Sequence, residues 1–264
     1  MVKQRLLQDT KNLVILNDSA LSADILLFYL FGFREWNRRF HGYFLQFLQD
    51  LASDNAQSLG FGYSFNIQNN LAWFLLKYHI EFTDYPKNLY ELDITTTPRG
   101  YNKLFAYRDF EILHNGTTIG RATTTWGLVD FNTRKMTNIA EKIVNNPHLT
   151  PHVKKEDDLT YGKILPLEKI DFEKIYDVRF DDLDVNCHVN NPNYIVWAFE
   201  PLDFNFRKSK KLKTLDMVFK KEIQYGGHVL SQVEVSGNLT KHVLKNQQTN
   251  EDLCQINALW IEKA

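Results

Sequence analysis

Residues 182–197 read Asp-Leu-Asp-Val-Asn-Cys-His-Val-Asn-Asn-Pro-Asn-Tyr-Ile-Val-Trp, and this stretch concentrates the chemically able side chains of the chain. If its first half is extended, Asp184, Asn186 and His188 project from one face and their apolar neighbours project from the other. A base and two polar groups that can position a reactant therefore converge on one side.

A helix is expected to follow directly. Pro192 suits the first position of a helix with Asn191 as its cap, so free backbone N–H groups and a positive dipole end open beside His188. Such a helix N-terminus suits a developing oxyanion, which indicates hydrolysis of an acyl group. Alternating polar and apolar residues are also typical of any half-exposed strand. The run 194–199 is apolar on every face, as in a buried helix, and favours the functional interpretation.

A metal site in this stretch is not expected. Asp182, Asp184 and Asn186 match the opening of a calcium-binding loop. The sixth place, which needs Gly, is Cys187, and the twelfth, which needs Glu, is Asn193. The histidine of the stretch has no second His or Cys at the spacing of zinc ligands. We predict no metal and no cofactor.

The two cysteines are interpreted as small buried residues. On an extended chain Cys187 faces away from His188, so it is poorly placed to share a proton with that ring. Cys254 lies in the apolar, strand-like run 253–261. Two cysteines so embedded give no sign of a disulfide framework and favour a reducing compartment.

The stretch Asp-Leu-Asp-Val-Asn-x-His-Val-Asn-Asn-x-x-Tyr-Ile-x-Trp over 182–197 closely resembles the active-site segment of plant and bacterial acyl-ACP (acyl carrier protein) thioesterases. Downstream, Met-Val-Phe-Lys-Lys-Glu-Ile over 217–223 resembles the second active-site strand of that family and places its acidic residue at Glu222. Ile223 stands where plant members often carry Cys, which fits a cysteine that is not the nucleophile.

The resemblance covers nearly the whole chain after about residue 23. Further segments fall in the family's order at 73–80, 85–86, 105–110 and 125–126. It implies an α+β protein of tandem hot-dog folds, each a long helix wrapped by an antiparallel β-sheet.

Apolar periodicity independently suggests one structural plan used twice. Helical spacing covers 44–52, with Gly60 placed to end the helix. Strand-like runs follow at 74–82, 89–97, 104–113 and 119–129, and then, after a polar stretch at 145–158, at 175–180, 214–223, 229–235 and 257–261. The offset between the two helix starts suggests duplication. We expect an N-terminal domain over 1–147, a linker over 148–165 and a C-terminal domain over 166–264. The resemblance implies that the first binds the acyl chain and the last carries the catalytic residues.

The resemblance implies roles for four residues. Asn186 would position water or the carbonyl, His188 would move the proton, Asp184 would orient or charge-stabilise the site, and Glu222 would hold or activate water. The division of labour between His188 and Glu222 stays open. Each has a structural alternative. Asp184 would cap the turn and Asn186 would bond loop backbone, while His188 would be a hydrogen-bonded core residue and Glu222 would pair with a neighbouring lysine.

Substrate contacts are expected in two places. The acyl chain needs an apolar tunnel, and the resemblance places its walls at Trp73, Phe74, Phe105 and Trp126, for which core packing is the alternative. The densest cationic run is expected to dock the acidic carrier protein, with a solvated loop as the alternative. It comprises Arg207, Lys208, Lys210, Lys211 and Lys213.

Composition narrows the class of protein. The 264 residues are 44% hydrophobic and 14% aromatic, enough for a substantial core. With 31 basic and 32 acidic residues, the net charge of −1 argues against a general nucleic-acid binder. The apolar run 25–33 is too short to span a bilayer and is predicted to be a first strand, and no signal or transit peptide is evident. We expect a cytoplasmic monomer or homodimer.

The predicted function is hydrolysis of the thioester of fatty acyl-ACP in fatty acid biosynthesis, with acyl carrier protein and the fatty acyl chain as partners. Three alternatives stay open: an acyl-CoA thioesterase, a hot-dog dehydratase, and a non-catalytic acyl-binding regulator. The set of Asp184, Asn186, His188 and Glu222 argues against the regulator.

Overall fold

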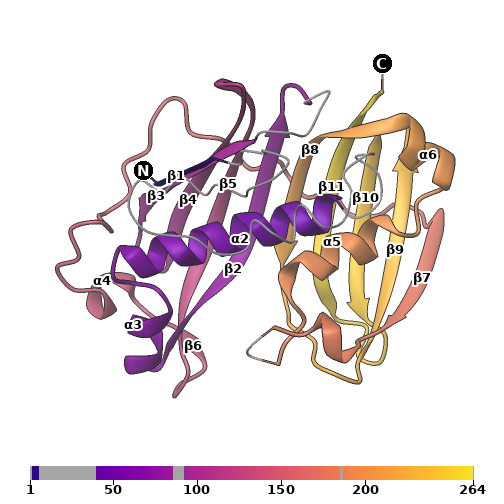
Figure 1. The fold of residues 1–264 in the computed structure, drawn as a ribbon. Coiled ribbons are helices and arrows are strands. Elements are labelled where there is room, and N and C mark those ends of the chain that lie inside the picture. The colour runs from indigo at the N-terminus through magenta and orange to yellow at the C-terminus, as the bar shows by residue number, and fades with distance from the viewer. Residues whose placement is uncertain (1, 6–39, 86–91, 185–186, 264) are drawn as a thin grey trace, which may run out of the picture. The chain divides into compact units, whose positions relative to one another are not determined.

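The computed structural model describes residues 2–5, 40–85, 92–184 and 187–263. The predicted first strand at 25–33 lies outside the described residues. Figure 1 shows a mostly β-sheet protein with few helices. Its elements are β1 (Val2–Arg5), α2 (Phe40–Ser58), α3 (Tyr63–Gln68), β2 (Leu71–Phe82), β3 (Asp93–Tyr101), β4 (Phe105–His114), β5 (Thr117–Asp130), β6 (Lys135–Met136), α4 (Ile139–Lys142), β7 (Phe172–Asp177), η1 (Phe180–Asp182), α5 (Asn191–Phe199), α6 (Phe204–Ser209), β8 (Lys210–Phe219), β9 (His228–Ser236), β10 (Leu239–Asn246) and β11 (Asp252–Glu262).

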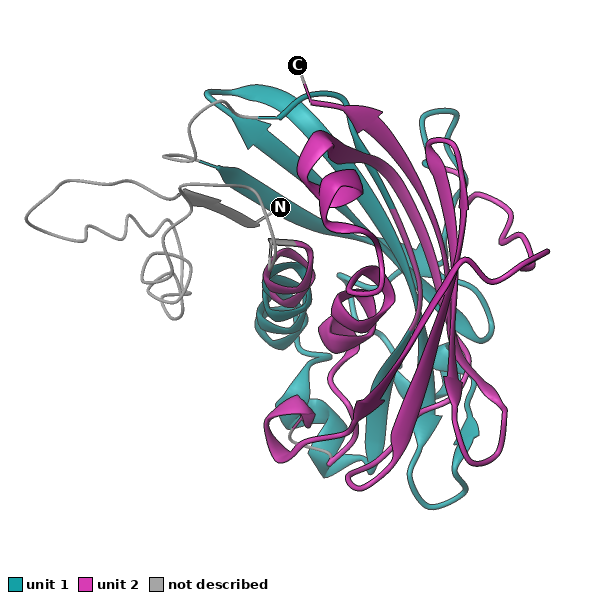
Figure 2. Cartoon of the chain, turned by 90° about the vertical axis from the view of Figure 1, so that its right-hand side faces the viewer, with its two compact units in different colours: residues 1–35, 47–75, 80–159 teal, residues 36–46, 76–79, 160–264 magenta. Residues whose placement is uncertain are grey.

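The chain divides into two compact units, coloured separately in Figure 2. Unit 1 comprises residues 1–35, 47–75 and 80–159, and unit 2 comprises residues 36–46, 76–79 and 160–264. The domain boundaries expected from the sequence, at 147/148 and 165/166, stay a prediction.

Unit 1 contains a sheet in the order β1-β3-β4-β5-β2, with β6 paired to β5. The pairs β1–β3, β3–β4 and β4–β5 are antiparallel. Strand periodicity is clear in β4, whose residues alternate between buried and half-buried. The α2 residues that belong to this unit bury Leu48, Leu51, Ala52 and Ala56. Ala56 joins a core cluster with Leu71, Ala106 and Leu128 of three strands, so the helix is held by apolar burial.

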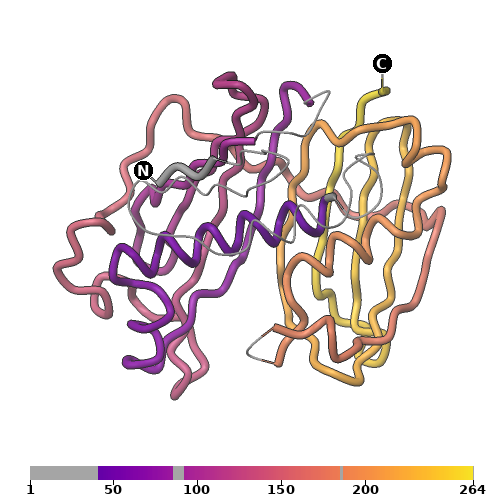
Figure 3. The backbone as a smooth tube through the Cα atoms, viewed as in Figure 1, coloured from indigo at the N-terminus to yellow at the C-terminus, as the bar shows by residue number. Residues whose placement is uncertain are grey.

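Unit 2 contains an antiparallel sheet in the order β8-β11-β10-β9-β7, traced from orange to yellow in Figure 3. Helix α5 contacts β9 and β10, and it buries Tyr194, Ile195 and Trp197 together with the residues that follow to its end. The ring of Trp197 stacks on Tyr176 of β7, with centroids 5.9 Å apart. Because most residues of α5 are buried, the prediction of a buried helix here is confirmed.

The start of α2 also belongs to unit 2. A Cβ atom at Gly42 would come within 2.7 Å of Cγ2 of Val196 on α5, so the two helices approach too closely there for a side chain. Next to it, the ring of His41 meets Phe199 edge-on at 5.3 Å between centroids. Glycine at this position therefore permits close helix–helix packing.

Most predicted elements are confirmed, with shifted ends. The helical pattern at 44–52 is the centre of α2, and Gly60 follows its end with a φ of +81°. The run 214–223 is β8 only as far as Phe219, so Glu222 lies beyond the strand rather than in it. Strand β10 was not predicted. Within the described residues, no helix is both long enough and apolar enough to cross a membrane.

Candidate active site

Asp184 and His188, two of the polar residues of the stretch 182–197, lie in a tight turn. The N–H of Asp184 donates to the carbonyl of His188 (2.7 Å), and the N–H of Cys187 donates to the carbonyl of Asp184 (3.0 Å). The side chain of Asp184 also accepts from the N–H of His188 (3.2 Å). The extended conformation expected here is therefore wrong: the chain folds back, and Asp184 caps the turn, as the structural alternative had it.

The turn overturns the expectation for one cysteine. Cys187 has a φ of +61°, in the left-handed region, and is exposed rather than buried. The strand alternation that would have buried it does not exist in a turn. Cys254 is fully buried in β11, as predicted, and burial raises the pKa of its thiol. Asn186 lies outside the described residues.

A buried carboxylate fixes the entrance to the turn. The side chain of Asp182 is 1% exposed and accepts from the backbone N–H of Arg179 (2.8 Å) and from its guanidinium (2.6 Å from Nη2 to Oδ1). The carbonyl of Asp182 accepts from the N–H of Asn190 (2.8 Å), just before α5 begins. The N-cap of α5 is Asn190, not Asn191, and its side chain forms no cap bond. The amide nitrogen of Asn190 donates to Oε1 of Gln46 (2.6 Å).

Backbone pairing brings a second segment to the turn. The N–H of Val189 donates to the carbonyl of Ile223 (3.1 Å), and His188 forms a bridge with Gln224. As a result Nδ1 of His188 lies 3.5 Å from Oε2 of Glu222. The two residues that the sequence placed in separate segments are thus neighbours.

Gln224 completes the surroundings of the histidine. Its amide nitrogen lies 3.2 Å from Nε2 of His188. An amide nitrogen donates, so Nε2 accepts and the proton of the neutral ring sits on Nδ1, facing Glu222. Sequence reasoning missed this residue, and its only signal was its position two places after Glu222.

Partial burial is the main influence on the pKa of Glu222, whose side chain is still 45% exposed. It raises the pKa of this carboxyl group, the positive charge of a protonated His188 opposes the rise, and the negative charge of Asp184 adds to it. The lysines next to it pair elsewhere: Lys220 with Asp252 (3.2 Å) and Lys221 with Glu251. Of the ionisable groups described, it is therefore His188, not a neighbouring lysine, that lies opposite Glu222.

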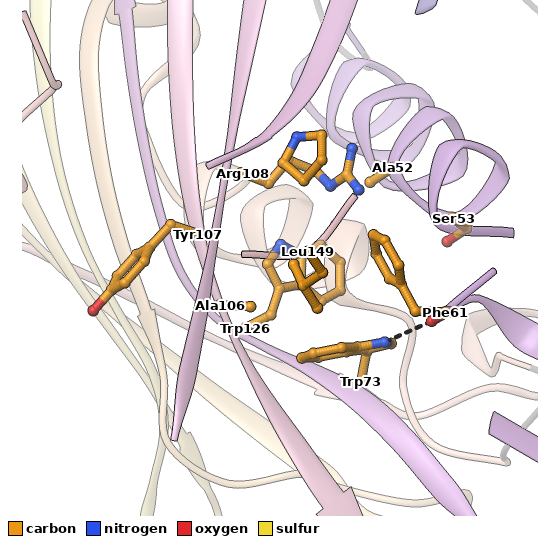
Figure 4. Close-up of a pocket in the computed structure, with 10 residues that line it drawn as sticks. Ala52, Ser53, Phe61, Trp73, Ala106, Tyr107, Arg108, Trp126 and Leu149 are labelled. Atoms are coloured by element: carbon orange, nitrogen blue, oxygen red, sulfur yellow. Dashed lines mark hydrogen bonds between the residues drawn. The ribbon is translucent and has the colours of Figure 1, made fainter. Parts of the chain in front are cut away.

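An apolar cavity of about 60 Å³ lies in unit 1 (Figure 4). Two of the four predicted tunnel residues, Trp73 and Trp126, line it, whereas Phe74 and Phe105 are not among its lining residues. The indole N–H of Trp73 donates to the carbonyl of Phe61 (2.9 Å), which fixes its ring. The full lining is Ala52, Ser53, Phe61, Trp73, Pro98, Ala106, Tyr107, Arg108, Trp126 and Leu149.

The cationic run lies on α6 and the start of β8. Arg207 pairs with Glu200 (3.0 Å), Lys210 pairs with Glu262, and Lys211 is half-buried. Lys208 and Lys213 are exposed and form no ion pair with the described residues. Among those residues, no group of three or more His, Cys, Asp or Glu side chains could hold a metal ion.

Comparison with known proteins covers both halves of the chain. Residues 42–146 match the family model described as "Acyl-ACP thioesterase N-terminal domain", and residues 167–262 match "Acyl-ACP thioesterase C-terminal domain". The palmitoyl-acyl carrier protein thioesterase of Arabidopsis thaliana is 27% identical over 181 residues, which are 64% of this chain and 43% of that protein. Oleoyl-acyl carrier protein thioesterase 2 of the same plant is 26% identical over 203 residues, 67% of this chain and 53% of that protein.

The chain thus spans about half the length of the curated relatives it matches. Among solved structures, the 12:0-ACP thioesterase from Umbellularia californica is similar with a TM-score of 0.74 and 21% identity, covering 84% of this chain and 90% of that one. At this identity the likeness shows a shared fold.

Proposed function

Because the chain belongs to the acyl-ACP thioesterase family, we propose that it hydrolyses the thioester of a fatty acyl chain carried on acyl carrier protein. The products are the free fatty acid and the carrier thiol. We propose with it the tandem hot-dog arrangement, which the antiparallel strands of the two units, the long helix α2 and the buried helix α5 support.

The observation that carries the proposal is the 3.5 Å approach of His188 Nδ1 to Glu222 Oε2. A carboxylate whose pKa is raised is a better base for water than an ordinary glutamate. The neutral ring of His188, with its proton on Nδ1, can donate to that carboxylate and hold it in position. Glu222 is therefore the proposed general base, and His188 orients it and shares its proton.

The reaction requires the transfer of one proton from water to the sulfur of the leaving thiol. A water molecule gives a proton to Glu222 while its oxygen attacks the thioester carbonyl carbon, and a tetrahedral oxyanion forms. The carbon–sulfur bond then breaks and the proton leaves the His188–Glu222 pair for the sulfur. A thiol of pKa about 8.5 is a good leaving group, so strong acid catalysis is not required. Asn186 keeps its proposed role of positioning water or the carbonyl, and Asp184 holds the turn and adds negative charge beside Glu222.

Two further parts of the protein are proposed to contact the substrate. The cavity in unit 1, with Trp73 and Trp126 in its wall, is proposed to bind the acyl chain. The exposed lysines 208 and 213 are proposed to dock the carrier, whose acidic character they complement.

The proposal is tested by measuring free-thiol release from acyl-ACP and acyl-CoA substrates of graded chain length. We expect release from both, with higher kcat/KM for the carrier-linked set, and free acid as the second product. An enoyl thioester in place of free acid would identify a dehydratase. Absence of turnover with every substrate would refute the thioesterase assignment.

A further inference from the structure

Arg108 of β4 is a buried cation without a carboxylate partner among the described residues. It is 5% exposed. Its Nη1 donates to the side-chain oxygens of Asn55 on α2 (2.7 Å) and Thr96 on β3 (2.9 Å), both neutral. A guanidinium has five N–H donors, and within the described part of the chain the donors on Nε and Nη2 have no hydrogen-bond acceptor. The polar capacity of this side chain is thus only partly used.

The group stays charged in spite of its burial. Burial lowers the pKa of Arg108 to about 10, and no neighbouring charge contributes to this shift. At neutral pH it is therefore a cation in an apolar environment. Buried charges in proteins are usually paired, because an unpaired one loses its hydration without compensation.

Arg108 borders the cavity of unit 1. In Figure 4 its guanidinium extends toward Ala52 of α2, while the rings of Phe61 and Trp73 and the side chain of Leu149 lie on the other side of the space. The ring of Tyr107 points away from this group of side chains. The cavity is therefore apolar on most sides and cationic at one place.

A plain hydrocarbon chain would match this cavity poorly. It would remove water from the unused N–H donors and offer no acceptor, and leaving a buried donor unsatisfied is unfavourable. An oxygen atom on the chain at this place would accept one or two of those hydrogen bonds. The cavity of about 60 Å³ is less than half the size of an engineered cavity of about 150 Å³ that holds one benzene, so only the end of a chain fits.

We propose that the cavity of unit 1 selects acyl chains that carry a hydrogen-bond-accepting oxygen at the end remote from the thioester, and that Arg108 recognises this oxygen. The inference rests on the proposed function, since it assigns the substrate class of that enzyme. A terminal hydroxyl and a terminal carboxylate share the required chemistry.

The first test compares kcat/KM of the unaltered protein for octanoyl-ACP, 8-hydroxyoctanoyl-ACP and the carrier thioester of octanedioic acid. We expect at least a tenfold preference for one of the oxygenated chains over octanoyl-ACP. The hydroxyl and carboxylate arms show whether hydrogen bonding suffices or charge pairing is needed. Equal rates, or preference for octanoyl-ACP, would overturn the inference while leaving the thioesterase assignment intact.

A second test assigns the preference to Arg108. Arg108→Met should abolish the selectivity, chiefly by lowering turnover of the oxygenated chains. Arg121→Met is the matched control, because Arg121 lies on the neighbouring strand β5 and donates to the carbonyl of Asp157 (2.9 Å). Selectivity retained in Arg108→Met would contradict the assignment.

A binding measurement separates the two hypotheses and does not depend on turnover. Calorimetry with amide analogues of octanoyl-pantetheine and 8-hydroxyoctanoyl-pantetheine should give at least tenfold tighter binding of the hydroxylated analogue. If no substrate is hydrolysed but this preference holds, the proposed function fails and the binding inference stands. Equal affinities would overturn the inference, even if Arg108→Met does not fold.

Discussion

Nδ1 of His188 lies 3.5 Å from Oε2 of Glu222, and the amide of Gln224 lies on the other side of the same ring, 3.2 Å from Nε2. His188 is therefore held between a carboxylate and an amide donor. Glu222 and Gln224 both belong to the segment that follows β8. This segment lies beside the turn because His188 and Val189 pair with Gln224 and Ile223. The arrangement predicts how each side chain contributes to turnover.

Removing the side chain function of either His188 or Glu222 should lower kcat. Glu222→Gln keeps the size of the side chain but removes the base, and His188→Ala removes the group that orients it. We expect a loss of about 10²- to 10⁴-fold in kcat in steady-state thiol-release assays. His228→Ala is the matched control, since His228 also faces a carboxylate, Asp177 at 3.4 Å, on the exposed surface. Losses of less than tenfold in both variants would contradict the assigned roles.

The acid limb of the pH profile should report Glu222. Because a protonated carboxyl group cannot accept a proton from water, kcat/KM should fall as the pH falls through the raised pKa of Glu222. Asp184→Asn removes a negative charge that raises this pKa, so the limb should move to lower pH in the residual activity. Asp177→Asn, an exposed site, should leave the limb in place. A limb that Asp184→Asn does not shift, or shifts upward, argues against Glu222 as the base.

Gln224 should set the tautomer of His188. Gln224→Leu removes the donor to Nε2, and a hydrogen bond of about 1 kcal/mol corresponds to a loss of roughly fivefold in kcat. The ring-nitrogen chemical shifts of His188 in NMR should move toward a mixture of tautomers. Gln232→Leu, which removes an exposed contact to Glu173, serves as the control. Unchanged ring-nitrogen shifts would remove Gln224 from the site.

Stability should depend on a part-buried pair, His79 and Asp216, within unit 2. Nδ1 of His79 lies 2.7 Å from Oδ1 of Asp216, which also accepts from the N–H of Gly162 (2.6 Å). Asp216→Ala leaves both groups without this acceptor, and we expect a loss of about 1–3 kcal/mol in the free energy of unfolding. Asp252→Ala, which breaks a more exposed pair with Lys220, should lose at most about 1 kcal/mol. Chemical denaturation measures both free energies of unfolding, and similar losses in Asp216→Ala and Asp252→Ala would contradict this ranking.

Reversal of the two exposed lysines of the cationic run should affect carrier-linked substrates most. In Lys208→Glu with Lys213→Glu we expect KM for acyl-ACP to rise at least fivefold, with a smaller change for acyl-CoA, since the carrier is acidic and large. Lys245→Glu is the control: it lies at the opposite end of the same sheet, where β10 meets the start of β11. Equal effects on both substrates would argue against docking at this surface.

Local patterns were enough to predict most elements. Helix α5 follows from its continuous apolar run, and β4 and β5 follow from strand-like runs and the turns that separate them. Strand β10 was not predicted because its polar residues include Lys241 and His242, which are buried. Lys241 bonds Glu234 (3.0 Å), and His242 bonds the carbonyl of Ala198 (2.8 Å). Polar side chains that find partners on a neighbouring strand or on the helix packed against the sheet break the hydrophobic alternation on which the prediction depends.

The sequence alone identified the residues 182–197 and 217–223 as chemically important and assigned their family by resemblance, because these features depend on neighbours along the chain. Three features required the tertiary structure. The pairing of His188 with Glu222 and Gln224 depends on the register between distant segments, and the exposure of Cys187 depends on a turn with positive φ. The burial of Arg108 without a carboxylate partner among the described residues depends on which side chains surround it. Each is a relation between residues far apart in the chain or a departure from regular backbone, which no local periodicity encodes.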